Sequence, residues 1–263
     1  MKISIVTLSF NQNAYLREAM DSILSQGYPD LEYIVLDPGS ADGSRELIKS
    51  YGERIAHVIF ETDRGAADGL NKGFARATGE IFGFVNADDL LFPGSLRLVG
   101  EFFESHAECD ILMGNGYIID AKGRRIRHCR ARDFTARRFF YGGSRWLQQS
   151  TFFRAQIFHN SPKFNPENRT CWDGELFVNL ATLGARIEYI NADLAGFRIH
   201  DASISGSGKM NEQYGQDQRR IFRQVHRHEW RTTDELLRIF YRAEGFIKSL
   251  NERFQAQRES AGR

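Results

Sequence analysis

Two adjacent carboxylates, Asp88 and Asp89, follow directly after the apolar run at residues 81–85, within the sequence Asn86-Ala87-Asp88-Asp89. An apolar run of this length is typical of a buried strand, so we expect the carboxylates at the C-terminal edge of a sheet, where open α/β sheets bind ligands. Clustered carboxylates repel each other, and a divalent cation that could hold a diphosphate relieves that repulsion. The alternative is an acidic turn that caps the next helix, with Pro93 at its first position.

Three earlier apolar runs also end in small, polar or acidic residues, at 9–13, 37–43 and 63–68. Glycine in such loops lets the backbone approach a ligand closely and supplies hydrogen-bond donors to phosphate. The first run is not followed by Gly-x-Gly-x-x-Gly, which argues against a dinucleotide-binding domain, and a P-loop motif is absent from the sequence. Four polar loops at one edge therefore indicate a ligand cleft.

The elements that position these loops alternate along the first hundred residues. Because strands that alternate with amphipathic helices favour a parallel sheet with right-handed crossovers, we expect an α/β fold. After residue 109 the pattern changes to longer strands, a hairpin turn and a single helix. Strands are expected at 3–8, 33–36, 57–60, 81–85, 110–119, 146–153, 186–190 and 194–199, helices at 14–26, 44–51, 66–77, 93–105 and 175–183, and the turn at 120–123.

The C-terminal segment predicts a long helix that begins at a capping box, Thr232 with Glu235. Behind the box, apolar residues recur at alternating spacings of four and three, which makes a narrow seam. We expect the seam to pack onto the body of the protein, with self-association into a homo-oligomer as the alternative. Arginines enrich residues 219–231, which is typical of a solvated basic face or of peripheral contact with an anionic membrane. The seam consists of Leu236, Phe240, Ala243, Ile247, Leu250 and Phe254.

The composition limits the classes of protein that this chain can belong to. Its 263 residues carry a net charge of +1, so no overall field indicates nucleic acid as a partner. The three cysteines are scattered, without the spacing of metal ligands, and are expected to be free thiols. The sequence contains no apolar stretch long enough for a signal peptide or a membrane span, so we expect a cytoplasmic protein, with the inner face of the membrane as its alternative location.

Taken in order, these motifs resemble those of family 2 glycosyltransferases of the GT-A fold. The resemblance implies a GT-A-like, Rossmann-like and mostly parallel sheet flanked by helices, with a helical C-terminal appendage. It implies a glycosyltransferase domain at 1–205, divided into a nucleotide-sugar-binding half at 1–105 and an acceptor half at 106–205, and a helical extension at 206–263. The motifs that carry it are residues 5–11, 37–44, 63–65, 71–80 and 86–89, and more thinly 148–153, 173–176 and 197–200.

The resemblance also implies a nucleotide-sugar donor held with Mg²⁺ or Mn²⁺. A UDP-sugar is the first expectation, and dTDP- and GDP-sugars are the alternatives. Asp88 and His200 are the implied metal ligands, although Asn86 takes the first acidic position of the Asp-x-Asp signature and supplies less charge. Pro38 replaces the usual glycine or aspartate and removes a donor. The implied donor-binding residues are Thr7, Ser9, Asn11, Asp37, Asp63, Arg64, Asp68, Lys72, Asn86 and Asp89.

For catalysis, the resemblance makes Asp173 the base of an inverting transfer and Glu175 the second candidate. Inverting transfer needs a carboxylate that takes the proton of the acceptor hydroxyl, while the departing diphosphate is stabilised on the opposite side of the sugar. A helix cap is the alternative role of Asp173. The acceptor, a saccharide or lipid-linked saccharide in cell-surface polysaccharide or glycoconjugate synthesis, is expected beside Trp146, Gln148 and Gln149. Two other functions stay open: a sugar-binding or scaffold protein of the same fold, and a sugar nucleotidyltransferase.

Overall fold

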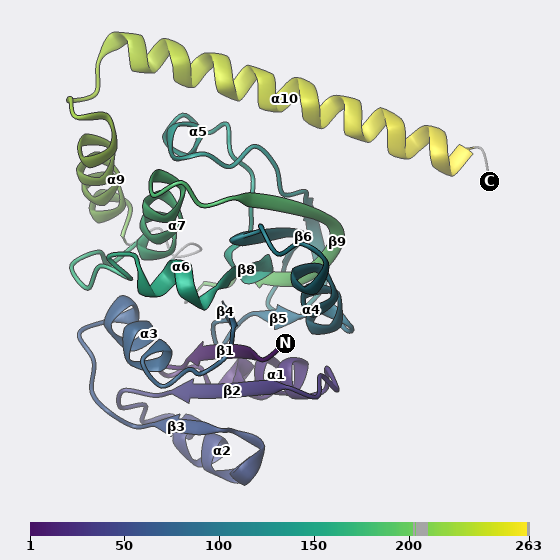
Figure 1. Cartoon of the computed structure of the whole chain (residues 1–263), viewed down its shortest axis with the longest axis vertical. Coiled ribbons are helices and arrows are strands. Elements are labelled where there is room, and N and C mark those ends of the chain that lie inside the picture. The colour runs from purple at the N-terminus through teal and green to yellow at the C-terminus, as the bar shows by residue number, and fades with distance from the viewer. Residues whose placement is uncertain (202, 204–209, 262–263) are drawn as a thin grey trace.

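The computed structural model describes the backbone of residues 1–201, 203 and 210–261, and the side chains of these residues as far as residue 250. In this part of the chain, a mixed nine-stranded sheet forms the centre, and helices cover both of its faces (Figure 1). The strand order is β3-β2-β1-β4-β8-β6-β9-β5, and β7 pairs with β6. The expected α/β architecture is therefore present, with a helical C-terminal region.

The first half of the sheet is parallel, because each strand returns through a helix. Strand β1 (Ile3–Leu8) lies between β2 (Leu31–Leu36) and β4 (Ile81–Phe84), and β3 (His57–Ile59) extends the sheet beyond β2. The crossovers run through α1 (Asn13–Leu24), α2 (Ser44–Ser50) with the short 3-10 helix η1 (Gly52–Arg54), and α3 (Ala66–Phe74). The C-terminal ends of these strands consequently meet at one edge.

The second half is mixed, and two of its expected strands differ in the structure. The predicted strand at 146–153 begins instead with the 3-10 helix η2 (Gln148–Ser150), and only β8 (Thr151–Arg154) is extended. The two strands predicted at 186–199 form a single strand, β9 (Ile187–Arg198), which pairs with β6 (Ile111–Ile119) through register shifts at Asn115. The predicted hairpin turn joins β6 to β7 (Arg125–Cys129). The remaining elements are β5 (Leu90–Leu91), α4 (Ser95–Ser105), α5 (Ala136–Phe140), α6 (Ala155–His159) and α7 (Trp172–Thr182).

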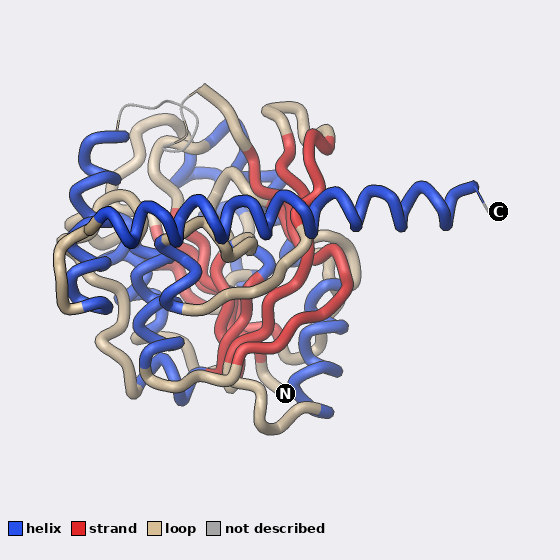
Figure 2. The backbone as a smooth tube through the Cα atoms, turned by 90° about the horizontal axis from the view of Figure 1, so that it is seen from above, coloured by secondary structure: helices blue, strands red, loops and turns tan. Residues whose placement is uncertain are grey.

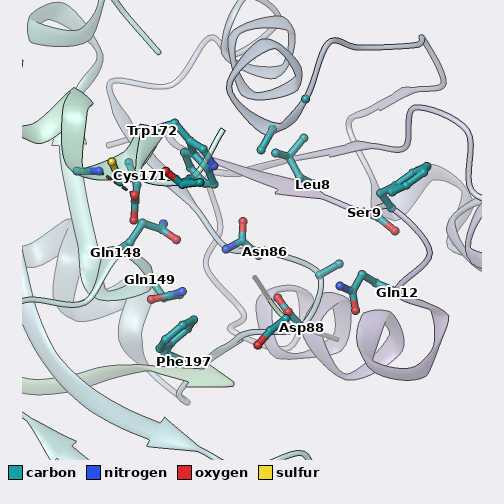
Figure 3. Close-up of a pocket in the computed structure, with 18 of the residues that line it drawn as sticks. Leu8, Ser9, Gln12, Asn86, Asp88, Gln148, Gln149, Cys171, Trp172 and Phe197 are labelled. Atoms are coloured by element: carbon teal, nitrogen blue, oxygen red, sulfur yellow. Dashed lines mark hydrogen bonds between the residues drawn. The ribbon is translucent and has the colours of Figure 1, made fainter. Parts of the chain in front are cut away.

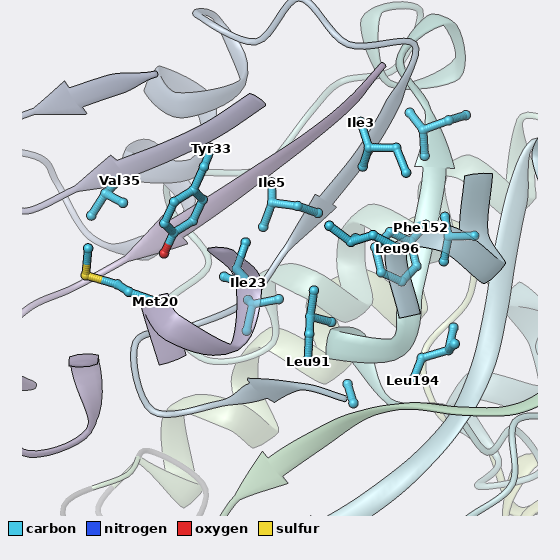
Figure 4. Packing of buried hydrophobic residues seen from close by; sticks show 14 of the residues in the cluster. Ile3, Ile5, Met20, Ile23, Tyr33, Val35, Leu91, Leu96, Phe152 and Leu194 are labelled. Atoms are coloured by element: carbon cyan, nitrogen blue, oxygen red, sulfur yellow. The ribbon is translucent and has the colours of Figure 1, made fainter. Parts of the chain in front are cut away.

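Alternation along the buried strands gives the sheet an apolar layer on each face. On one face, Ile3 and Ile5 pack with Met20 of α1 and Leu96 of α4 (Figure 4). On the other face, Val6 packs with residues of α3, α6 and α7. Helix α3 lies especially close to β1, because an added Cβ at Gly73 would stand 2.7 Å from a Val6 methyl carbon. This packing accounts for the glycine of the Asn71-Lys72-Gly73 motif without any role in ligand binding.

Two helices follow the sheet at the C-terminus, α9 (Asn211–His226) and α10 (Thr232–Ala261). Helix α10 crosses the body, and its C-terminal half projects beyond it (Figures 1 and 2). The expectation that the apolar seam packs onto the body is wrong: Leu236, Phe240 and Ile247 are 57–63% exposed. The expected domain boundary at 205/206 falls within residues 204–209, outside the described residues, and the side chain of Phe254 is also outside them.

Candidate active site

A cleft of about 870 Å³ opens where the ends of the parallel strands meet α7. Asn86, Asp88 and Gln12 face it from the strand ends, while Cys171 and Trp172 face it from the start of α7 (Figure 3). The cleft therefore lies at the sheet edge where the polar loops were expected to gather. Predicted site residues that line it are Ser9, Asp63, Asn86, Asp88, Trp146, Gln148, Gln149 and Asp173.

The acidic loop after β4 directs one carboxylate into the cleft and buries the other. Asp88 lines the cleft, and its Oδ2 lies 3.1 Å from Nε2 of His200. Asp89 is fully buried: Gln149 donates to its Oδ2 at 2.6 Å, and the Arg198 backbone amide donates to its Oδ1 at 2.8 Å. Burial, reinforced by the negative charge of Asp88, raises the pKa of Asp89 well above its ordinary value. Asp89 therefore shapes the loop. The sequence analysis expected it to bind the donor, but its side chain does not line the cleft.

Arg198 fixes this loop in place, a role that the sequence analysis did not assign. Its guanidinium is 1% exposed, and Nε donates to the Asp88 carbonyl at 2.7 Å. The same side chain donates to the carbonyls of Asp120 and Ala121 and pairs with Glu18 at 2.6 Å. In the sequence, Arg198 belongs to the motif at 197–200, but that motif does not indicate which residues the arginine binds. Strand β9 ends at Arg198, and His200 follows two residues later. Since both residues contact Asp88, the end of this one strand sets the position of Asp88.

The loops after β1 and β2 contain two buried oxygens that lack a partner within the described part of the chain, Ser9 Oγ and Asp37 Oδ2. The other carboxylate oxygen of Asp37 accepts from the amides of Gly39 and Ser40 and from Arg45 Nε at 3.1 Å. Burial raises the pKa of Asp37, but these hydrogen bonds outweigh burial and leave the pKa below its ordinary value. Because a buried polar atom without a partner is costly, the two oxygens mark a place where ligand donors can bind.

Asp173 lies on the opposite wall of the cleft, in the first turn of α7. Its side chain accepts from the Gly174 amide at 2.8 Å, while Cys171 holds the cap position of the helix. Burial raises the pKa of Asp173 to about 6, and the hydrogen bond from Gly174 only partly offsets that shift. A carboxyl with this pKa is ionised at neutral pH and takes up a proton readily, which suits a general base.

Glu175, the second candidate base, is held away from the cleft. Both of its oxygens bind Arg220 of α9, at 2.6 and 2.7 Å, and its side chain also accepts from Asn165 and Asn168. Burial raises the pKa of Glu175, but these partners outweigh burial and lower it. The expectation that Glu175 acts as a base is therefore wrong: it anchors α9 to α7.

Several predicted donor-binding residues lie outside the cleft lining. The Thr7 side chain is buried in the core, where it accepts from the Tyr33 hydroxyl at 3.0 Å. Asn11 joins two loops, since its amide donates to Ser40 Oγ and its side chain accepts from the Ala41 amide. Of the other five, Asp37 lies directly before the lining residue Pro38, and Asp89 is buried next to Asp88. The last three form one charged cluster on the loop and first turns of α3, in which Arg64 and Lys72 both pair with Asp68.

The wall expected on the acceptor side is present, and it is wider than the sequence indicated. Trp146 lines the cleft and packs against Phe134 and Phe177, so its ring also serves the core. The amides of Gln148 and Gln149 bind the Phe84 carbonyl and Asp89, so they shape the wall. Two lining residues that the sequence analysis missed are Phe139 of α5 and Tyr214 of α9. Neither lies in a motif, and their separation along the chain hid their proximity.

A divalent cation would find two protein ligands here. Asp88 Oδ2 lies 3.1 Å from His200 Nε2, so the carboxylate and the imidazole are close enough that both would be able to hold one cation. Within the described residues, no group of three or more His, Cys, Asp or Glu side chains is placed to hold a metal. The pair therefore fits a cation whose remaining ligands come from a bound molecule and water.

Comparison with known proteins identifies the family. The model of glycosyl transferase family 2 matches residues 4–159. The uncharacterized glycosyltransferase alr2836 of Nostoc sp. is 30% identical over 233 residues, which are 83% of this chain and 71% of that protein. The chain belongs to glycosyl transferase family 2. This protein is therefore an enzyme of the glycosyltransferase class.

Other similar proteins extend the comparison. TuaG of Bacillus subtilis, named for teichuronic acid biosynthesis, is 37% identical over 90 residues, which are 33% of this glycosyltransferase and 36% of TuaG. The structure of S. aureus TarS 1–349 in complex with UDP-GlcNAc superposes with a TM-score of 0.69 at 19% identity, over 92% of this chain and 71% of that one. The mannosyltransferase PcManGT of Pyrobaculum calidifontis, in complex with GDP-Man and Mn²⁺, has a TM-score of 0.65 at 18% identity, over 94% and 69%. These two structures bear out the fold.

Among the described residues, no helix combines the length and the apolar content that crossing a bilayer requires.

Proposed function

We propose that this glycosyltransferase transfers a sugar from a UDP-sugar to a saccharide hydroxyl, with inversion at the anomeric carbon. The observation that carries the proposal is the placement of Asp173 and Asp88 on the walls of one cleft. Inversion requires the acceptor oxygen and the leaving diphosphate to stand on opposite sides of the sugar, each beside its own protein group. A carboxyl whose pKa is about 6 lies on one wall, and Asp88 lies on the other, with His200 behind it at 3.1 Å.

Asp173 is the proposed general base. Its carboxylate takes the proton of the acceptor hydroxyl as that oxygen attacks the anomeric carbon, and the bond from that carbon to the diphosphate oxygen breaks. The Gly174 amide holds one carboxylate oxygen at 2.8 Å, which leaves the second oxygen for the acceptor. Transfer of the proton to a base that is ionised at neutral pH contributes a factor of about 10² to 10⁴ in rate.

The donor lies along the strand ends. Ser9 Oγ and Asp37 Oδ2 are the proposed acceptors for the donor groups of the nucleoside, since both oxygens are buried and lack a partner in the described part of the chain. Asp88 and His200 are the residues that would hold Mg²⁺ or Mn²⁺. When bound, the cation supplies positive charge that stabilises the departing diphosphate. The complexes of TarS with UDP-GlcNAc and of PcManGT with GDP-Man and Mn²⁺ support this class of donor and cofactor.

The acceptor occupies the wall formed by Trp146, Phe139 and Tyr214. Aromatic faces suit the C–H surfaces of sugars, and a tyrosine adds a hydroxyl that can bind a sugar hydroxyl. We place the reaction in the synthesis of a cell-surface polysaccharide or glycoconjugate, with a saccharide or lipid-linked saccharide as acceptor. The name of TuaG supports this assignment.

A thermal-shift panel tests the donor and the metal together. UDP-, GDP- and dTDP-sugars are added to the wild type with and without Mn²⁺, because a ligand that binds only the native state raises the melting temperature. The expected result is a shift with UDP-sugars that requires Mn²⁺ in the wild type and is lost in Asp88→Ala. A shift of equal size without Mn²⁺, or in Asp88→Ala, contradicts the assignment of Asp88. Shifts only with GDP- or dTDP-sugars contradict the choice of uracil as the nucleobase of the donor.

A further inference from the structure

Helix α10 exposes a continuous apolar stripe, which we define as Leu236, Ile239, Phe240, Ala243, Phe246, Ile247 and Leu250. Its five largest exposed members are each between 57% and 65% exposed. Because successive residues of the stripe are three or one apart, they share one side of the helix. Large exposed apolar patches mark interaction sites in soluble proteins.

The opposite side of α10 is already occupied by the body. Asp234 accepts from the Tyr141 hydroxyl at 2.6 Å, and Glu244 pairs with Arg138 at 3.1 Å. Lys248 pairs with Asp133 at 2.6 Å. These contacts fix the rotation of the helix, so the stripe cannot turn inward without breaking them. The stripe consequently stays exposed to solvent while α10 keeps its contacts with the body.

The exposed apolar area of the stripe is large enough for a stable interface between two copies of the helix. Taking roughly 200 Å² as the full area of one large apolar side chain, the five largest members leave roughly 600 Å² uncovered on each copy. Two copies joined along their stripes would bury up to about 1,200 Å², which is the lower end of the range for stable interfaces. In Figure 1, α10 lies along the outside of the body, and no other described element is drawn on its outer side.

The spacing and the charges favour a second helix over a lipid surface. Leu236, Phe240, Ala243, Ile247 and Leu250 follow one another at intervals of four, three, four and three, the repeat of helices that pair side by side. A helix that lies on anionic lipid carries an excess of Lys and Arg beside its apolar face. Beside this stripe, Arg238 is paired with Glu235. The flank is therefore not strongly cationic.

We infer that the stripe on α10 is the contact surface for a second copy of this chain. The two helices pair along Leu236 to Leu250, with Ala243 near the middle, where its small side chain lets the backbones approach. The inner side of each helix stays on the segment that includes α5 and leads to Trp146. Pairing thus adds a second layer behind the acceptor wall and leaves the cleft of each copy open.

The test measures the mass of the full chain by light scattering during size-exclusion chromatography, from low to high micromolar concentration. The wild type is expected at twice the chain mass of 30.2 kDa. In the variant Phe240→Glu with Ile247→Glu, the dissociation constant should rise by more than about 100-fold, because two charges enter the centre of the seam. Leu183→Glu is the matched control: Leu183 is 55% exposed at the end of α7, outside the stripe, and its variant should remain dimeric.

Three results overturn the inference. The first is a monomeric wild type at every concentration, and the second is a dimer that survives Phe240→Glu with Ile247→Glu. The third is a monomer that binds vesicles of phosphatidylglycerol and loses that binding in the double variant, which would assign the stripe to lipid. Circular dichroism and the melting temperature show whether each variant is folded. Since all substituted side chains are exposed, native values are expected.

Discussion

The ionisation of Asp173 is predicted to set the pH dependence of transfer. Burial raises its pKa from 3.8 to about 6. Because only the carboxylate accepts a proton, kcat/KM follows the ionised fraction, which is about one tenth at pH 5 and about nine tenths at pH 7. The predicted rise between these two pH values is therefore about tenfold. A carboxyl that kept a pKa of 3.8 would be almost fully ionised throughout, and the rate would stay nearly constant.

The assay measures release of the nucleoside diphosphate at subsaturating donor and acceptor from pH 4.5 to 8. Histidine is the other side chain that ordinarily titrates in this range, so His200→Asn is measured as a control. The account predicts that His200→Asn lowers the rate but leaves the midpoint near pH 6. Two results refute the assignment of this pH dependence to Asp173. One is a wild-type kcat/KM that does not change with pH, and the other is a midpoint that disappears in His200→Asn.

The same pKa shift predicts a gain in stability when Asp173 is neutralised. A carboxyl whose folded-state pKa is raised contributes stability that is present below its unfolded value of 3.8 and is lost as the pH rises through about 6. At pH 7 the charge of Asp173 therefore costs up to about 3 kcal/mol. Asp173→Asn should raise the melting temperature at pH 7 but not at pH 3.5, and should lower kcat by about 10² to 10⁴. A less stable variant at pH 7 would contradict the buried environment.

Three further substitutions separate positioning from chemistry. Arg198→Met should destabilise the fold by about 3 kcal/mol or more in urea unfolding, since buried carbonyls lose their donor, and should raise KM for the donor. Normal stability with impaired transfer would contradict that role. Glu175→Gln should also cost about 3 kcal/mol but change kcat less than threefold, because a bidentate buried pair is broken away from the cleft. Its stabilisation, present above pH 4.5, is lost as the pH falls through the lowered folded-state pKa. A large loss of kcat at unchanged stability would restore Glu175 as a base. Tyr214→Ala should lower kcat/KM for the acceptor about tenfold at constant donor affinity, and weaker donor binding would contradict its place on the acceptor wall.

The parallel half of the fold could be predicted because its signals are local. Each short apolar run is followed by a polar loop and an amphipathic helix, and topology alone brings those loops to one edge. The gathering of Ser9, Asn86 and Asp88 around one cleft follows from that rule. The second half was harder, because β9 changes register beside Asn115 and β8 begins after a 3-10 helix.

The roles of individual charged residues depended on contacts between distant segments. Glu175 lies two positions from Asp173 in the sequence, yet Arg220 draws it away from the cleft. Arg198 lies 110 positions after the carbonyl of Asp88 that it binds. The seam of α10 had the expected spacing, but the ion pairs of Glu244 and Lys248 with the body turned it outward. Periodicity predicts an apolar face but does not indicate which partner covers it.

The central claim is that two residues on opposite walls of the cleft have separate roles: Asp88 binds the donor, and Asp173 performs the proton transfer. Calorimetric titration of UDP in Mn²⁺, performed on the wild type, Asp88→Ala and Asp173→Asn, tests it most directly. The predicted result is binding of equal affinity in the wild type and in Asp173→Asn, which does not transfer sugar, and loss of the Mn²⁺-dependent affinity in Asp88→Ala. Weak binding in Asp173→Asn together with unchanged binding in Asp88→Ala would contradict it.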